Sequence, residues 1–208
     1  MPRKPRQTRS RATYEAIVEA GFRCVAEHGV ANTTTRAIAD QAGVGVGSLY
    51  EYFKDKDAIF AAMNERIIHD VVVLIQRVGP LALELDIESA ISHFFDAFNR
   101  FLLADNERYL KVAREVLSVD TRDSVEPISK ALQDMVVQYL LKHRPLLNSQ
   151  EDIPALAYII INSSIFVMLR LLSTSNPPIT YEQLKNGMAR LVSVYAKASH
   201  LYPIPPPP

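Results

Sequence analysis

Residues 33–56 read TTTRAIADQAGVGVGSLYEYFKDK, and this stretch predicts two short helices separated by a glycine-marked turn. Apolar residues three and four positions apart share one face of a first helix: Ile38, Ala39 and Ala42. Gly43 ends that helix, because glycine readily adopts the positive φ of a sharp turn. A second helix is expected over about 46–53, with Leu49 and Phe53 facing inward. The pattern predicts a helix-turn-helix, with an ordinary pair of short helices as the alternative.

The outward arc of the second helix is small at its N-terminal end, where Gly47 and Ser48 precede Glu51 and Tyr52. A helix that lays its first turn in the major groove of DNA needs small or hydrogen-bonding residues there. Gly47 lowers helix propensity by about 1 kcal/mol relative to alanine. Its presence therefore suggests that close approach to a partner matters more than local helix stability.

Several segments of this stretch resemble the N-terminal signature of TetR-family transcriptional regulators. They are TTRAIA at 34–39, AGV at 42–44, GSLYEYF at 47–53 and KDK at 54–56. The resemblance covers about residues 10 to 60. It implies an all-α fold of about nine helices: an N-terminal three-helix DNA-binding head with the helix-turn-helix, and a C-terminal helical body that binds ligand and dimerises.

In that family the matching positions contact DNA, which implies a DNA-binding set of Thr34, Thr35, Arg36, Val46, Gly47, Ser48, Tyr50, Tyr52 and Lys56, the last on a phosphate. This chain departs from the pattern at Gly45, where the family often has a serine cap, and Val46 and Gly47 offer base edges no hydrogen-bonding side chain. We therefore expect base readout from Arg36, Ser48 and Tyr52, or from methyl contacts of Val46 to thymine.

The chain has 208 residues, 48% of them hydrophobic, and a formal net charge of +0. Residues 1–60 hold nine Lys/Arg and seven Asp/Glu, a net charge of +2, which leaves −2 for the rest. A weakly basic head on a weakly acidic body suits a protein that touches DNA at one end. Cys24 is the only cysteine, which excludes an internal disulfide.

Neither catalytic nor ligand-binding motifs of the common enzyme classes are present in the sequence. We find no serine in a nucleophile elbow, no phosphate-binding glycine loop and no paired carboxylates at a readable spacing, so we expect no enzyme. The five histidines have no metal-ligand spacing, and we expect neither a metal nor a cofactor. Without a signal peptide or a run of eighteen apolar residues, the expectation is a cytoplasmic, nucleoid-associated bacterial protein with no membrane partner.

Changes in composition and helix-capping residues along the chain predict four regions. Residues 1–11 form a basic flexible arm, with a merely solvated tail as the alternative; 12–55 form the helix-turn-helix domain; 56–202 form the ligand-binding and dimerisation domain; and 203–208 form a proline-rich tail. Thr33 or Thr34 caps the first motif helix, and Asp55 caps a long helix that ends at Gly79-Pro80. We interpret this long helix as a lever between ligand and DNA.

The body is predicted to contain helices over about 86–103, 107–119, 125–143, 153–172 and 180–201. The fourth is apolar nearly all round, so every side must be covered. A second subunit, giving an intersubunit four-helix bundle, is one cover, and burial inside a monomeric core is the other. The expected homodimer interface comprises Tyr158, Asn162, Ser163, Phe166, Leu191 and Tyr195.

Clustered aromatic residues in the body indicate either ordinary core or an apolar cavity for a drug-sized ligand. The candidate ligand-binding residues are His69, His93, Phe94, Phe98, Arg114 and Tyr139. The sequence thus predicts a dimeric repressor that a small apolar or aromatic effector releases from a near-palindromic double-stranded operator. The alternative is a helix-turn-helix protein without an effector, with an architectural or activator role.

Overall fold

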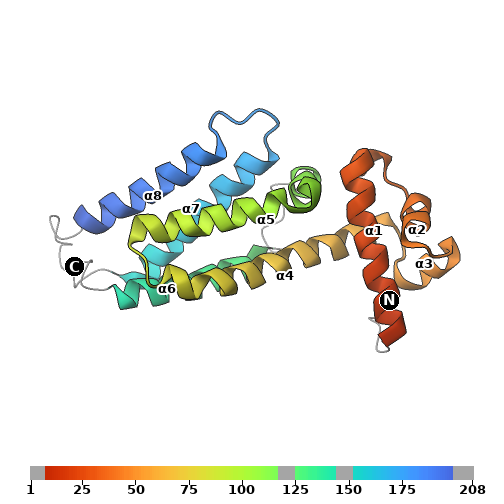
Figure 1. Ribbon diagram of the computed structural model, residues 1–208, viewed down its shortest axis with the longest axis horizontal. Helices are drawn as coiled ribbons and strands as arrows, with labels where there is room; N and C mark the ends of the chain where they lie inside the picture. The colour runs from red at the N-terminus through yellow and green to blue at the C-terminus, as the bar shows by residue number, and fades with distance from the viewer. Residues whose placement is uncertain (1–7, 117–124, 144–151, 199–208) are drawn as a thin grey trace, which may run out of the picture. The chain divides into compact units, whose positions relative to one another are not determined.

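The computed structural model describes residues 8–116, 125–143 and 152–198. Eight α-helices and no strand occur in these ranges (Figure 1). The all-α fold class is confirmed. The helices are α1 (Thr8–Asn32), α2 (Thr35–Ala42), α3 (Val46–Tyr52), α4 (Lys56–Ala82), α5 (Ile87–Val116), α6 (Glu126–Lys142), α7 (Ile153–Ser173) and α8 (Tyr181–Ala198).

The chain divides into two compact units, and α4 and α5 each contribute residues to both. The head unit comprises Met1–His69 and Phe101–Thr121, and the body unit comprises Asp70–Arg100 and Arg122–Pro208. These bounds differ from the domains predicted at 12–55 and 56–202, because the second half of α5 packs with the N-terminal helices. Whether 12–55 folds as a domain of its own stays a prediction.

Helix α1 supplies the centre of the head unit. Ile17 and Phe22 of α1 are buried, as are Ile38 of α2 and Ile59 of α4. Gly21 lies where a Cβ would come within 2.7 Å of the Met63 sulfur, so glycine allows α1 and α4 to approach closely. This core holds the helices that carry the predicted DNA-contacting residues.

The start of α1 corrects one prediction. The helix starts at Thr8, so residues 8–11 are helical and do not belong to a flexible arm. No proline lies between Pro5 and Pro80, and Arg9 and Arg11 are good helix formers. Residues 1–7 lie outside the described part of the chain. Gly29, with φ 75° and ψ 164°, interrupts the helix.

Helix α4 is longer than predicted, because it passes through Gly79-Pro80 and ends at Ala82. The proline removes one helical hydrogen bond, but the next turn is retained, since the Leu83 amide donates to the Gly79 carbonyl at 3.0 Å. The expected stop at Pro80 was therefore wrong.

Two predicted helices, over 86–103 and 107–119, are a single element, α5. Asp105 and Glu107 have φ of 48° and 60°, so the backbone leaves the right-handed helical region there. The predicted polar break is local and does not separate two elements. The predicted break at 120–124 and the tail at 203–208 lie outside the described residues.

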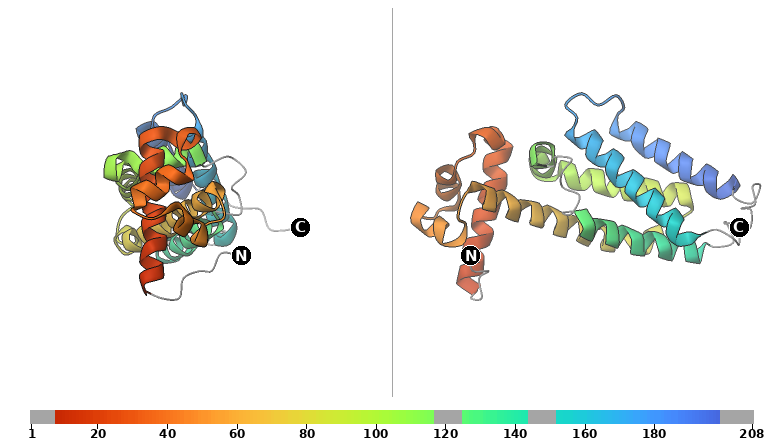
Figure 2. Two further views of the ribbon diagram at one scale, coloured as in Figure 1. Left: turned by 90° about the vertical axis from the view of Figure 1, so that its right-hand side faces the viewer. Right: turned by 180° about the vertical axis from the view of Figure 1, so that it is seen from behind.

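In the body unit, α7 packs against α6 and α8, and both views show α7 and α8 side by side (Figures 1 and 2). Tyr181 of α8 donates its hydroxyl proton to the Phe95 carbonyl at 2.8 Å, and the two rings meet edge to face. Lys185 adds an ion pair with Asp96 at 2.8 Å. These contacts fix the start of α8 against α5.

Candidate nucleic-acid interface

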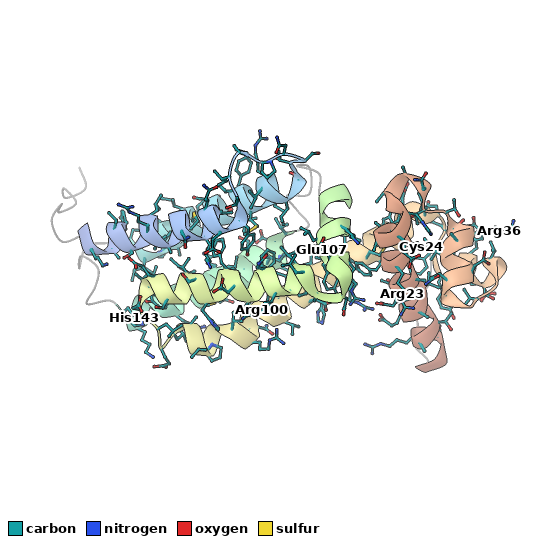
Figure 3. The ribbon with its side chains drawn as sticks, turned by 45° about the horizontal axis from the view of Figure 1, so that its top comes forward. Arg23, Cys24, Arg36, Arg100, Glu107 and His143 are labelled. Carbon is teal, nitrogen blue, oxygen red and sulfur yellow. The ribbon has the colours of Figure 1, made fainter. Side chains whose placement is uncertain are left out.

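The first motif helix, α2, begins at a capped threonine. Thr34 has extended backbone angles, and its hydroxyl oxygen accepts a hydrogen bond from the Ala37 amide at 3.1 Å. Thr33 has another role, because its hydroxyl donates to the Gly29 carbonyl at 2.8 Å and is buried. Of the two expected caps, Thr34 is thus the cap of α2. Thr35 and Arg36 then occupy the first turn, with Arg36 exposed (Figure 3).

The turn between the motif helices has the hydrogen bonds of a Schellman motif. Gly43 adopts φ 70° and ψ 29°, its amide donates to the Asp40 carbonyl, and the Val44 amide donates to the Ala39 carbonyl at 3.0 Å. The left-handed backbone at Gly43 explains the glycine, since a Cβ is disfavoured there. The predicted change of direction after α2 is confirmed.

Helix α3 points a short apolar side into the head unit and leaves the other side open. Leu49 is fully buried, and Phe53, the C-terminal cap residue, stacks on Tyr14 of α1 with ring centroids 4.8 Å apart. Gly47 and Ser48 are exposed, and Tyr52 is half-buried. A Cβ placed on Gly47 meets no atom within 4 Å. Nothing within the described chain therefore requires glycine at that position.

One polar contact joins the outer faces of the two motif helices. The hydroxyls of Thr35, in the first turn of α2, and Tyr50, on α3, lie 3.2 Å apart. The Tyr50 side chain is 50% exposed. Each hydroxyl keeps a second hydrogen-bonding position, so the pair offers donors and acceptors to one external group. This contact fixes the separation of Thr35 and Tyr50.

Asp55 and Lys56 lie at the start of α4, and each makes a contact within the head unit. Asp55 caps the helix, accepting from the Ala58 amide at 2.8 Å. The Lys56 ammonium donates to the Val30 carbonyl at 3.3 Å and lies 5.5 Å from the centre of the Phe60 ring. One of its three N–H donors is therefore used to bind the end of α1, and two stay available.

Below the motif, α1 is tied to α4 by polar contacts as well as by packing. Arg66 and Glu15 form an ion pair between the two helices. Burial raises the pKa of Tyr14 above its usual value, and the nearby Glu65 carboxylate adds to the effect. The Tyr14 ring consequently stays neutral at physiological pH and serves as an apolar support for Phe53.

The structure separates the residues predicted to bind an effector. His69 belongs to the head unit, whereas His93, Phe94, Phe98 and Tyr139 belong to the body unit. Phe94 and Phe98 are half-buried one turn apart on α5, with parallel rings 6.3 Å apart. Arg114 lies on α5, with its side chain outside the described set.

Tyr139 instead holds the turn between α4 and α5. Its hydroxyl donates to the Leu85 carbonyl at 3.0 Å, and its ring stacks on His143, whose Nε2 lies 3.1 Å from the Leu83 carbonyl. Burial raises the pKa of Tyr139 to about 12. A hydroxyl engaged in this way is a poor candidate for an effector contact, and its ligand role stays an untested prediction.

The predicted interface residues on α7 and α8 lie on an exposed surface. Tyr158, Phe166 and Leu191 are about 60% exposed, at 63%, 57% and 62%, and Tyr195 is 43% exposed. Asn162 and Ser163 are also exposed, and each donates its side-chain hydrogen bond to the carbonyl four residues earlier. The Asn162 amide nitrogen and the Ser163 hydroxyl thus each have a partner within α7.

Helix α7 is also long and apolar enough to cross a membrane, judged by length and composition alone, with a mean hydropathy of 1.9 in its most apolar window. Its buried residues Ala157, Ile161 and Met168 face α6 and α8 within the body unit. The helix therefore has one side in the core of the body unit and another side open.

Residues 17–63, which span α1 to the start of α4, match the family described as bacterial regulatory proteins, tetR family. This segment is similar to the N-terminal region of TetR-family regulators. A second finding agrees: 78 residues, or 38% of the chain, are 28% identical to the HTH-type transcriptional repressor Rv1474c of Mycobacterium tuberculosis. That match spans 42% of the repressor's own length, so the chain aligns with less than half of this relative.

Solved structures of regulatory proteins share the fold over nearly the whole chain. A TetR-family transcriptional regulator from Pectobacterium atrosepticum has a TM-score of 0.64 at 20% identity, covering 91% of this chain and 95% of that one. SmeT, the repressor of the SmeDEF multidrug efflux pump of Stenotrophomonas maltophilia, has a TM-score of 0.60 at 22% identity, covering 90% and 91%. The fatty acid degradation regulator FadR from Bacillus halodurans has a TM-score of 0.65 at 17% identity, covering 91% and 96%.

Proposed function

We propose that this chain is a sequence-specific DNA-binding transcriptional regulator of the TetR family, a repressor that a small apolar or aromatic ligand releases from its operator. The observation that carries this proposal is the helix-turn-helix of α2 and α3, with its Schellman turn, buried Leu49 and open outer face. Matching of residues 17–63 to a family of regulatory proteins supports the same function.

The DNA-contacting residues divide by chemistry. Arg36, Ser48 and Tyr52 carry the hydrogen-bonding groups suited to base edges, and Val46 offers methyl groups to thymine. Thr34, whose hydroxyl proton stays available beyond its cap bond, and the Thr35–Tyr50 pair are suited to phosphate oxygens.

Gly47 and Lys56 have special places in this scheme. No intramolecular contact explains glycine at position 47, so we infer that the DNA backbone or a base edge occupies the space next to it. The Lys56 ammonium uses one donor on Val30 and keeps two for a phosphate. Its contact with α1 would then fix the position of the phosphate relative to α2 and α3.

A second copy of the chain is proposed to cover the open side of α7 and α8. The surface is largely apolar, and its exposed large side chains include Tyr158, Phe166 and Leu191. Asn162, Ser163 and Ser164 each donate a hydrogen bond to a carbonyl within α7, which lowers the cost of burying these three side chains, and burial of the apolar area gains free energy. Two chains would thereby present two heads, and recognition of successive major grooves requires a separation of about 34–36 Å.

An effector would act by changing that separation. A ligand that binds the body more tightly in one arrangement shifts the population toward it, and DNA weakens ligand binding by the same factor. SmeT represses a multidrug efflux pump, and a FadR from Bacillus subtilis has been crystallised with stearoyl-CoA, which supports ligands with large apolar parts. The half-buried Phe94 and Phe98 are the proposed contacts in the body unit. The protein would then function in the bacterial cytoplasm, at the nucleoid, as a regulator and not as an enzyme.

Selection of random duplexes by the purified chain tests this proposal. We expect a near-palindromic sequence to be enriched, and Arg36→Ala and Tyr52→Ala to weaken its binding at least tenfold while the helical circular dichroism spectrum is unchanged. Lys130 is an exposed residue on α6, in the body unit, so Lys130→Ala is the matched control and should bind as the wild type does. Equal binding of all duplexes by the wild type, or unchanged binding by both head variants, would contradict the proposal.

A further inference from the structure

The second half of α5 is built into the head unit around Tyr109. This ring meets Phe22 of α1 edge to face at 5.3 Å and stacks on Phe101 at 4.6 Å. Tyr109, Leu110 and Val112 are buried. Because the first half of α5 carries Phe94 and Phe98, one continuous element links the proposed effector residues to α1.

Arg108 adds a charged contact to this apolar packing. Its Nη1 lies 2.6 Å from the Glu19 carboxylate on α1, and its Nη2 lies 3.3 Å from the Asp105 carboxylate. The guanidinium carbon also lies 4.8 Å from the centre of the Tyr109 ring and 5.7 Å from that of Phe22. The Arg108 side chain is only 21% exposed, so the geometry is held more firmly than in a solvent-exposed ion pair.

The backbone beside Arg108 is held in an unusual conformation. Asp105 and Glu107, neither of them glycine, have positive φ of 48° and 60° (Glu107 is labelled in Figure 3). Such residues keep these angles when the surrounding contacts favour them. Here the Asp105 carboxylate pairs with Arg108, which in turn pairs with Glu19. The bend of α5 and the position of α1 are therefore linked through one guanidinium.

We propose that Arg108 is a positioning residue for operator binding: by joining Glu19 to the bend of α5, it holds α1 in the orientation from which the motif reads DNA. This inference rests on the proposed function. Helix α1 packs against α2 and supports α3 through Tyr14 and Phe53. A change in the orientation of α1 would therefore also reorient both motif helices. A head that is free to reorient loses that freedom on binding, which lowers operator affinity.

The contact between Arg108 and Glu19 also gives the proposed ligand a route to change DNA affinity. A ligand bound against Phe94 and Phe98 that straightens or tightens the bend at Asp105 and Glu107 would draw Arg108 away from Glu19. In this proposal the ligand would change the populations of two states, one with Arg108 paired to Glu19 and one with the two side chains apart. Arg108 therefore controls DNA affinity without touching DNA.

The test is a double-variant cycle on the full-length chain, with binding to the selected operator measured by fluorescence anisotropy at several KCl concentrations. Glu19→Gln, which keeps the size of the side chain, and Arg108→Met are each expected to weaken operator binding about tenfold. The double variant should bind no more weakly than either single variant, because both remove the same contact. The slope of log affinity against log salt should be unchanged, since neither residue neutralises a phosphate.

Arg23→Met is the matched control, since Arg23 also reaches Glu19, but at 3.7 Å and with a side chain 57% exposed. It should bind within twofold of the wild type. Hydrogen exchange of α1 in the free protein should be faster in Glu19→Gln and Arg108→Met than in Arg23→Met. If Arg108→Met fails to fold, Glu19→Gln alone carries the same expectation.

Unchanged operator affinity in Glu19→Gln, additive effects in the double variant, or a salt slope reduced by about one would each overturn the inference. Failure of the proposed function looks different, because the wild type itself would then show no preferred duplex, and the inference would fall with it. A normal wild-type operator with unaffected variants would reject only the role of Arg108.

Discussion

Among the described residues, the head unit exposes two large apolar side chains, Tyr50 and Leu103, whereas the body unit exposes ten. Six of those ten lie on α7 and α8: Tyr158, Ile159, Phe166, Leu191, Val194 and Tyr195. The head unit closes its core within one chain and presents hydroxyls and Arg36 outward. The described part of the body unit leaves an apolar surface on α7 and α8 open. This difference agrees with the proposed partners, a second chain for the body unit and polar, charged DNA for the head unit.

The largest effect is expected from placing a charge on the α7–α8 surface. Phe166→Asp would bury an unpaired carboxylate twice in a symmetric dimer, at a cost of several kcal/mol. We expect a monomer in sedimentation velocity experiments at micromolar concentration. Leu81→Asp changes an apolar side chain of similar exposure, 53%, elsewhere in the body unit, and should leave the dimer intact. A wild-type chain that sediments as a monomer and binds phospholipid vesicles would contradict the interpretation of this surface.

Removing packing from the head should be the next largest effect. Leu49→Ala deletes a fully buried side chain from α3, and we expect a loss of about 3 kcal/mol in the free energy of unfolding. Ser48→Ala, an exposed change on the same helix, should stay within about 0.5 kcal/mol. Chemical denaturation followed by circular dichroism measures both, and equal stabilities would show that α3 is not packed as described.

A smaller loss is expected from the cap of α4. Asp55→Ala removes the acceptor of the Ala58 amide and should lower the free energy of unfolding by about 1.5 kcal/mol. Asp55→Asn keeps a capping oxygen and should retain most of the stability. If the asparagine variant is as unstable as the alanine variant, the carboxylate acts through its charge and not as a cap.

The smallest effect concerns the body. Tyr139→Phe removes one hydrogen bond to Leu85 and should cost about 1 kcal/mol near neutral pH. In the wild type the pKa of Tyr139 is raised to about 12, so the unfolded chain loses this proton first as pH rises above about 10. Stability should therefore fall between about pH 10 and 12, and Tyr139→Phe should show less of this fall. A pH profile of the denaturation midpoint tests the difference, and identical alkaline slopes would contradict it.

Local features of the head could be predicted from the sequence because they depend on neighbouring residues. The turn after α2 has a left-handed backbone that favours glycine at position 43, and Asp55 caps the helix that directly follows it. Both features depend on adjacent residues and not on the tertiary structure. Helix bounds were harder to predict. The Gly79-Pro80 pair is a signal for the end of a helix, but α4 continues through it to Ala82.

Contacts between residues far apart along the chain could not be predicted from the sequence. The hydrogen bond from Lys56 to Val30 and the pairing of Arg108 with Glu19 join residues 26 and 89 positions apart. No spacing rule relates such positions. Helical periodicity also could not tell whether Tyr139 faces a cavity or a turn, because both are apolar surroundings with one polar group.

The central claim is that two heads, held together by the α7–α8 surface, bind one duplex together. The most direct measurement compares the selected operator with a duplex in which one half-site is scrambled, by sedimentation of protein–DNA mixtures. We predict two chains on the full operator at nanomolar protein, and at least a hundredfold loss of affinity on the half-site duplex. One chain per duplex, with equal affinity for both duplexes, would contradict the account.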